Sequence, residues 1–104
     1  MVSKTIMNEL KKFVNRLNED FEILDIILFG SRVNGKEGKE VDFDLIIVSS
    51  DFDKMGFFER GAKMYDYWEL DYPVDFLCYT PKEFNKLKNK VSIVKEAIET
   101  GINI

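Results

Sequence analysis

We predict an α+β fold, an α/β-type mixed sheet with flanking helices, from three features of the sequence. Segments with helical spacing of apolar residues alternate with short, continuous apolar runs. The longest of these runs, 26–29 and 45–48, are strand-length and far too short to span a membrane. At 104 residues the chain has room for one hydrophobic core, so we expect a single domain over residues 1–104.

The first half of the chain predicts one helix and two strands. Residues 3–18 have a helical stripe of apolar residues, and residues 21–29 form a strand whose end is apolar on both faces, as central strands are. Residues 30–39 read as a loop with a short helical turn starting at Ser31. Residues 41–49 form the second strand. Side chains alternate along this strand between two faces. One face carries Asp42, Asp44, Ile46 and Val48, and the opposite face carries Phe43, Leu45 and Ile47.

The second half predicts a helix, a strand and two further helices. The helix at 54–69 should bury Met55, Phe58, Ala62, Tyr65 and Trp68, and the strand covers Val74 to Tyr79. Thr80, Pro81 and Glu83 form a helix start with a capping box. The inner face of that helix is expected to be Phe84, Leu87 and Val91. A last helix at 92–100 should bury Val94, Ala97 and Ile98 and stop at Gly101.

Composition excludes several kinds of chemistry. The chain has no histidine and one cysteine, Cys78, which removes serine–histidine and cysteine–histidine nucleophiles, histidine metal sites and internal disulfides. The remaining carboxylates, hydroxyls, Lys and Arg favour hard cations such as Mg²⁺. The net charge of −4 argues against binding nucleic acid over the whole surface. One cysteine and no signal-peptide pattern indicate a cytoplasmic protein.

Three carboxylates are candidate cation ligands. Asp42 and Asp44 share a strand face with Cα atoms about 6.5 Å apart, and Asp75 enters the third strand. If the third strand neighbours the second, the three acids stand together, and their repulsion requires a cation between them. The alternative is that they are solvated acids at strand ends.

Gly30 and Ser31 are a candidate phosphate cradle. They end a buried strand, where backbone N–H groups and a hydroxyl can bind phosphate oxygens. The alternative is an ordinary turn with Ser31 as a helix cap.

Two further features are open: the lysines at 82, 86, 88, 90 and 95 form either a solvated face or a patch for an acidic ligand. The aromatic-rich stretch 57–79 is mostly core, and any surplus would form a protein-binding surface.

The order of these parts resembles the DNA polymerase beta-like nucleotidyltransferase superfamily, in particular its minimal nucleotidyltransferase (MNT) group. The motifs are GSRVNG, residues 30–35, and DFDL, residues 42–45, followed by a distant acid, Asp75. The resemblance implies the polymerase beta-like fold and nucleotidyl transfer with two Mg²⁺ ions. Asp42, Asp44 and Asp75 would hold the metal, and Asp75 would also help to deprotonate the acceptor hydroxyl. The nucleotide would be bound by Gly30, Ser31, Arg32 and Gly35.

The resemblance also implies a partner. We expect no separate acceptor-binding domain. MNT proteins are often paired with a HEPN-domain toxin, and some of them transfer AMP to a tyrosine of that partner. The first hypothesis is therefore transfer of AMP from ATP to a hydroxyl of a HEPN partner, as the antitoxin of a toxin–antitoxin pair. Two alternatives stay open. One is a non-catalytic module that masks the HEPN partner, and the other is transfer to RNA or a small molecule.

Overall fold

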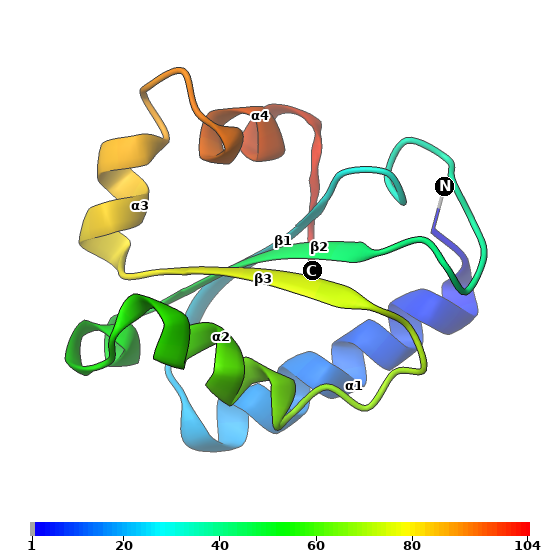
Figure 1. The fold of residues 1–104 in the computed structure, drawn as a ribbon, viewed down its shortest axis with the longest axis horizontal. Helices are drawn as coiled ribbons and strands as arrows, with labels where there is room; N and C mark the ends of the chain where they lie inside the picture. Colours follow the sequence, from blue (N-terminus) through cyan, green and yellow to red (C-terminus); the bar gives the residue numbers. More distant parts are fainter. Residues whose placement is uncertain (1) are drawn as a thin grey trace.

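The computed structural model describes residues 2–104 and contains a four-stranded sheet flanked by helices (Figure 1). In chain order the elements are α1 (Lys4–Asp20), β1 (Ile23–Phe29), β2 (Phe43–Ser49), the 3₁₀ helix η1 (Ser50–Lys54), α2 (Phe57–Tyr65), β3 (Val74–Tyr79), α3 (Pro81–Leu87), α4 (Ile93–Thr100) and β4 (Ile102–Asn103). The strand order is β3-β2-β1-β4. Only the β2–β3 pair is parallel, so the sheet is mixed and the predicted α+β class is confirmed.

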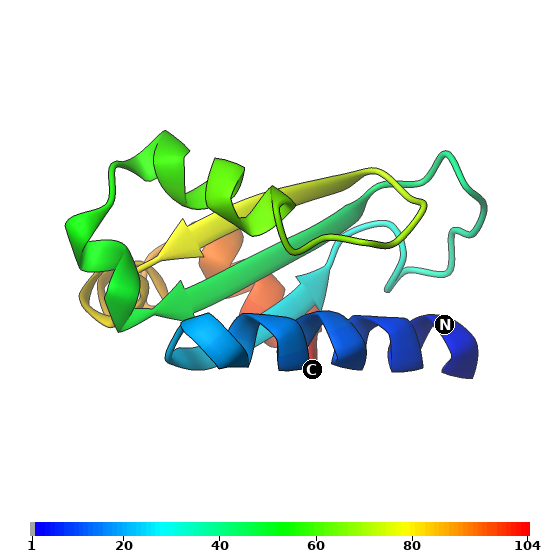
Figure 2. The same cartoon turned by 90° about the horizontal axis from the view of Figure 1, so that it is seen from below.

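The sheet separates two apolar clusters. On one face α1 and α2 contribute Leu10, Phe13, Leu17 and Met64, and Figure 2 shows α1 extended beneath the strands. On the other face α3 and α4 contribute Phe84, Val94 and Ala97. The alternation predicted for β2 is confirmed, because Phe43, Leu45 and Ile47 join the first cluster and Ile46 and Val48 join the second.

The loop after β1 and the starts of β2 and β3 lie at the same end of the sheet (Figure 1). β1 runs antiparallel to β2, and β2 runs parallel to β3, so this arrangement follows from the strand directions. The first strand starts at Ile23 rather than Phe21, and the second at Phe43 rather than Val41. Asp42 therefore precedes β2, whereas Asp44 and Asp75 lie within strands.

The helix predicted at 54–69 is wrong in its length and its inner face. The segment forms η1, a break at Gly56 and the short helix α2. Phe58 is 88% exposed, and Ala62 and Tyr65 are also exposed. The buried side chains are Phe52, Arg60 and Met64. Because α2 packs mainly against the edge strand β3, only a narrow stripe of it is covered, and Phe58 and Tyr65 remain exposed. Met55 and Trp68, just beyond the two ends of α2, are partly buried against the core as predicted.

Two smaller errors lie near the C-terminal helices. Val91 is fully exposed, because α3 ends at Leu87 and the chain turns before α4. Ile98 is 43% exposed, so α4 buries Val94 and Ala97 without it.

The capping box predicted at the start of α3 is confirmed: the Thr80 hydroxyl accepts from Glu83 N at 3.2 Å, and Glu83 Oε1 accepts from Thr80 N at 2.9 Å. Within residues 2–104, each helix is too short or too polar to cross a membrane.

Candidate functional site

The two strand acids lie side by side across the sheet. Asp44 pairs in register with Phe29 of β1 on one side and with Asp75 of β3 on the other. The condition stated from the sequence, that the third strand neighbours the second, is met. Asp42 is exposed just before β2, Asp44 is half-buried and Asp75 is exposed. This row of side chains is therefore open to solvent at one end of the sheet.

The acids interact electrostatically. Burial raises the pKa of Asp44 above its ordinary value of 3.8, and the charges of Asp75 and then Asp42 raise it further. Each of these effects penalises the ionised carboxylate of Asp44. A cation bound beside the three acids would reverse the penalty from like charges.

A cavity of about 420 Å³ opens beside these acids. Asp44 and Asp75 line it together with apolar side chains, among them Phe29, Leu77 and Ile93. From α2, Gly61 and Tyr65 complete the wall. A space with carboxylates on one side and apolar groups on the other can take a ligand that has both a charged, metal-bound part and an apolar ring.

Gly30 lies so close to Asp44 that there is no room for a side chain at this position. Its φ of +82° belongs to the left-handed region, and a Cβ at this position would clash with Asp44 Oδ2. The Gly30 carbonyl oxygen accepts hydrogen bonds from Val33 N at 3.1 Å and Asn34 N at 3.3 Å. The chain therefore makes a tight turn directly at the carboxylate. Ser31, the next residue, is half-buried, and its carbonyl oxygen accepts from Lys36 N at 3.0 Å.

Arg32 lies in the loop after this turn, and its part in nucleotide binding stays a prediction. Its side chain is only 4% exposed. Nε and Nη2 donate to Val41 O at 3.1 and 2.9 Å, and Nη2 also donates to Gly38 O at 2.7 Å. The guanidinium therefore holds the loop together. Gly35 has a φ of +96°, a left-handed conformation that glycine adopts readily, and its place in nucleotide binding stays a prediction.

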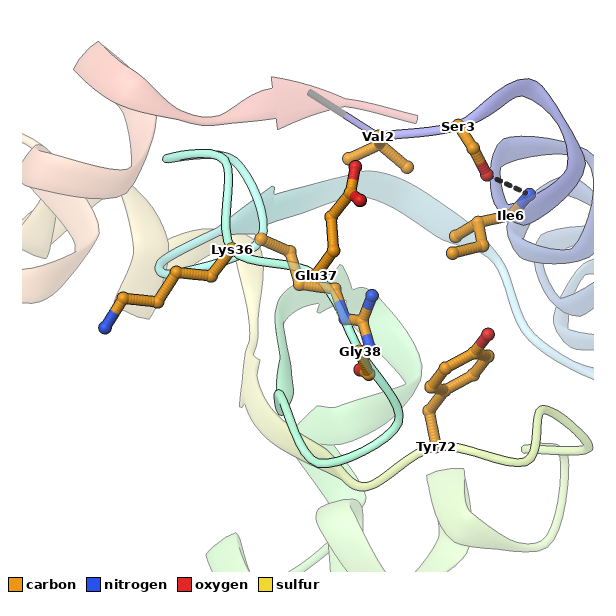
Figure 3. A pocket seen from close by; sticks show the side chains of 8 residues that line it. Val2, Ser3, Ile6, Lys36, Glu37, Gly38 and Tyr72 are labelled. Carbon is orange, nitrogen blue, oxygen red and sulfur yellow. Dashed lines mark hydrogen bonds between the residues drawn. The ribbon is translucent and has the colours of Figure 1, made fainter.

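A second cavity of about 230 Å³ lies between the start of α1 and this loop. Figure 3 shows Val2, Ile6 and Tyr72 around it, with Glu37 and Gly38 of the loop on the other side and Lys36 pointing away. The strand acids do not line this cavity. We therefore place the candidate site at the larger, acidic cavity.

The carboxylate oxygens of the three acids are suitable ligands for a divalent cation, but the three side chains are not arranged as a preformed metal site. Three carboxylates act on one another, and oxygen donors of this kind are those that Mg²⁺ takes. Within residues 2–104, however, no three acidic or thiol side chains are arranged so that they could hold a metal ion. A metal site at Asp42, Asp44 and Asp75 stays a prediction.

Sequence reasoning missed Tyr65 and Phe29 as site residues. Tyr65 was assigned to the core, yet its hydroxyl donates to Val74 O next to Asp75, and its ring lines the acidic cavity. Burial raises the pKa of Tyr65, and the charges of Asp75 and Asp42 add to this. No sequence motif marks Tyr65. The signal for Phe29 was its position at the end of β1, directly before Gly30.

A mixed sheet with flanking helices, a glycine turn after its first strand and acids on two neighbouring strands define the polymerase beta-like nucleotidyltransferase fold. The sequence pattern of the nucleotidyltransferase domain family matches residues 8–100. The chain belongs to this family.

One solved structure supports the fold. The chain is similar to the crystal structure of a protein from Sulfolobus solfataricus named a "putative nucleotidyltransferase", with a TM-score of 0.56 and 20% identity. The similarity covers 88% of this chain and 86% of the other. None of the curated proteins matches the chain.

Proposed function

We propose that this protein is a Mg²⁺-dependent nucleotidyltransferase that transfers AMP from ATP to a hydroxyl group of a partner protein. The observation that carries the proposal is the register of Asp44 with Asp75, next to Gly30 and beside an open cavity. Membership of the nucleotidyltransferase domain family supports the class of reaction. The nucleotide, the metal and the acceptor are our inferences from the chemistry of the site and from the MNT resemblance.

Each part of the site has a role in this proposal. Asp42, Asp44 and Asp75 are the residues that would hold Mg²⁺, which when bound would neutralise phosphate charge during in-line displacement of pyrophosphate. Asp75, the more exposed of the two strand acids, would accept the proton of the attacking hydroxyl. The backbone turn at Gly30 and Ser31 would bind phosphate oxygens. The apolar wall at Phe29, Leu77 and Ile93 would shield the reacting groups from water.

The acceptor in this proposal is a HEPN-domain protein, and the pair would act as toxin and antitoxin in the cytoplasm. The resemblance of residues 30–45 to the MNT group supports this partner. An exposed acceptor side fits it too, because Asp75 and Tyr65 are both reachable from solvent. A tyrosine or serine hydroxyl on a folded partner could approach the acids from that side.

The test uses ATP labelled at different phosphates. The purified protein is incubated with Mg²⁺, a HEPN protein encoded beside it and either [α-³²P]ATP or [γ-³²P]ATP. Label on the partner from the α-phosphate alone is expected, because AMP is transferred and pyrophosphate leaves. Asp44→Asn should abolish that label, whereas Glu40→Gln, which removes an exposed charge from the neighbouring loop, should keep it. Label from the γ-phosphate, or label that survives in the Asp42→Asn/Asp44→Asn protein, would contradict nucleotidyl transfer at this site.

A specific observation favours one second candidate, a module that masks its partner by binding alone. Phe57 and Phe58 expose 51% and 88% of their surface, and the centroids of their rings lie 5.7 Å apart. Exposed neighbouring aromatic residues are typical of protein-binding surfaces. If the Asp42→Asn/Asp44→Asn protein neutralises the partner as well as wild type does, and Phe58→Ser does not, binding alone accounts for the function.

A further inference from the structure

We propose that Arg32 is a positioning residue that fixes the relative placement of the turn at Gly30–Ser31 and the acids Asp42, Asp44 and Asp75. The inference rests on the proposed function for its catalytic consequence. Its structural part is that the buried guanidinium of Arg32 fixes the loop and the two acid-bearing segments to one another. This part rests on the contacts of Arg32 alone. This role would replace the nucleotide contact that the family resemblance implies for Arg32.

The hydrogen bonds of Arg32 join two ends of the loop. The residue follows Ser31 directly, and its Nε and Nη2 donate to Val41 O while Nη2 also donates to Gly38 O. Val41 directly precedes Asp42. The guanidinium thus connects the turn at Gly30–Ser31 to the peptide that leads into the acids. A loop closed across its base in this way keeps few conformations.

Aromatic contacts join Arg32 to both of the segments that carry the acids. Its Cζ lies 4.1 Å from the ring centroid of Phe43 and 4.6 Å from that of Tyr72. Phe43 stands between Asp42 and Asp44, and Tyr72 stands in the turn that leads to Asp75. In addition, Phe43 N donates to Pro73 O at 2.9 Å, which fixes the same two segments to each other. Figure 3 shows that Tyr72 and Gly38 come from separate segments beside one cavity.

The burial and the contacts of Arg32 indicate why an arginine, rather than another cation, fits this position. Within residues 2–104 it makes none of the salt bridges found, and its charge is compensated by carbonyl oxygens and by the faces of two rings. A planar guanidinium satisfies these partners together, because its donors lie in one plane and its faces stack on rings. A lysine ammonium is a point charge and cannot do both. The geometry therefore requires the shape of arginine and not only its charge.

The activity test compares Arg32→Lys with Arg32→Met in the label-transfer reaction. Positioning predicts that kcat falls about 10- to 100-fold in both variants, since a small misplacement of reacting groups costs up to about 100-fold. The KM for ATP should change less than kcat. Lys36→Met, which removes an exposed cation from the same loop, is the control and should stay near wild type. A phosphate contact predicts the reverse: Arg32→Lys active, and Arg32→Met raised in KM with unchanged kcat. Either result overturns the inference.

A second variant keeps the test valid if the Arg32 variants do not fold. Tyr72→Leu removes one ring from the guanidinium, although Tyr72 does not line the acidic cavity. It should lower kcat about three- to tenfold. Where Arg32→Met folds, combining the two changes should add little, because both release the same contact. Wild-type kcat in Tyr72→Leu would contradict the proposal.

Amide hydrogen exchange separates this inference from the proposed function, because it needs no activity. In Tyr72→Leu, and in Arg32→Met if folded, amides of residues 33–43 should exchange about tenfold or more faster, with protection of β1 and the rest of β2 retained. Unchanged exchange in this segment would overturn the inference even if wild type transfers AMP. If wild type transfers no label but exchange accelerates as described, the proposed function fails and the positioning role of Arg32 stands.

Discussion

Asp44 lies between Phe29 and Asp75 across the sheet, and its carboxylate is close to the backbone of Gly30. Burial and the neighbouring acids make the ionised form of Asp44 unfavourable in the folded protein. A residue placed at such a cost is typical of functional sites, where charge arrangement serves a ligand rather than stability. This trade-off between stability and activity can be measured.

Replacing the carboxylate of Asp44 should stabilise the metal-free protein while abolishing activity. The folded-state pKa is raised, so the contribution of Asp44 to stability is present below its ordinary pKa of 3.8 and is lost as pH rises through the raised value. Asp44→Asn should therefore melt about 2–4 °C above wild type at pH 7. The difference should shrink as pH falls towards 4. Thermal unfolding followed by circular dichroism checks this, with Glu40→Gln as the control for net charge. A destabilised Asp44→Asn protein would contradict the account of repulsion.

Gly30→Ala should damage both folding and the site. The left-handed φ and the clash with Asp44 Oδ2 act together. We expect a loss of about 1–3 kcal/mol in the free energy of unfolding and a fall of about 100-fold in kcat/KM. Urea unfolding and label transfer measure the two effects. Gly61→Ala is the matched control for urea unfolding alone, because Gly61 lies inside α2, where an added Cβ meets nothing within 4 Å, but also lines the acidic cavity. That variant should gain up to about 1 kcal/mol.

At the scale of elements, the sequence predicted strands better than helices. The alternation of β2, the bounds of β3 and the capping box at Thr80 follow from local rules of spacing and hydrogen bonding. The inner faces of α2, α3 and α4 depend on how much of each helix its neighbours cover, which is a property of the tertiary structure. Phe58, Val91 and Ile98 were assigned to the core because they fit a helical stripe, yet they lie beyond the covered width.

The corrected face of α2 can be tested by a pair of substitutions. Met64 is fully buried, so Met64→Ala should lower the free energy of unfolding by about 2–5 kcal/mol. Phe58 is 88% exposed, so Phe58→Ala should change it by less than about 0.5 kcal/mol. Urea unfolding of both variants decides between the two faces. Equal losses would restore the face predicted from the sequence.

The contact between α2 and α3 should make stability depend on pH. Arg60 Nη1 donates to Glu83 Oε1 at 2.6 Å, and this bond is the main reason that the pKa of Glu83 is lowered from its ordinary value of 4.5. A lowered pKa contributes stability that is present above pH 4.5 and lost as pH falls through the folded-state value. Glu83→Gln should therefore be less stable than wild type at pH 7, by about 1 kcal/mol because Glu83 is partly solvated. The two proteins should converge in urea unfolding as pH falls below the lowered pKa of Glu83. A constant difference across this range would contradict the contribution of the ion pair.

At the scale of the whole molecule, the candidate site is formed where three segments meet at one end of the sheet. The sequence indicated the acids and the glycine turn, because each departs from what a buried strand needs. It could not indicate Tyr65, which reaches the acidic cavity only because α2 lies against β3. Nor could it indicate that Arg32 turns inward onto Val41 O, Phe43 and Tyr72, since Tyr72 comes from a distant part of the chain and the loop conformation brings Val41 and Phe43 to the guanidinium.

The most direct test of the central claim is a crystal structure of the protein with Mg²⁺ and the non-cleavable analogue α,β-methylene-ATP. We expect metal density among Asp42, Asp44 and Asp75, and phosphate oxygens at the backbone of Gly30 and Ser31. Arg32 should keep its hydrogen bonds to Gly38 O and Val41 O. A nucleotide bound away from these acids, with no metal at Asp44, would contradict the claim.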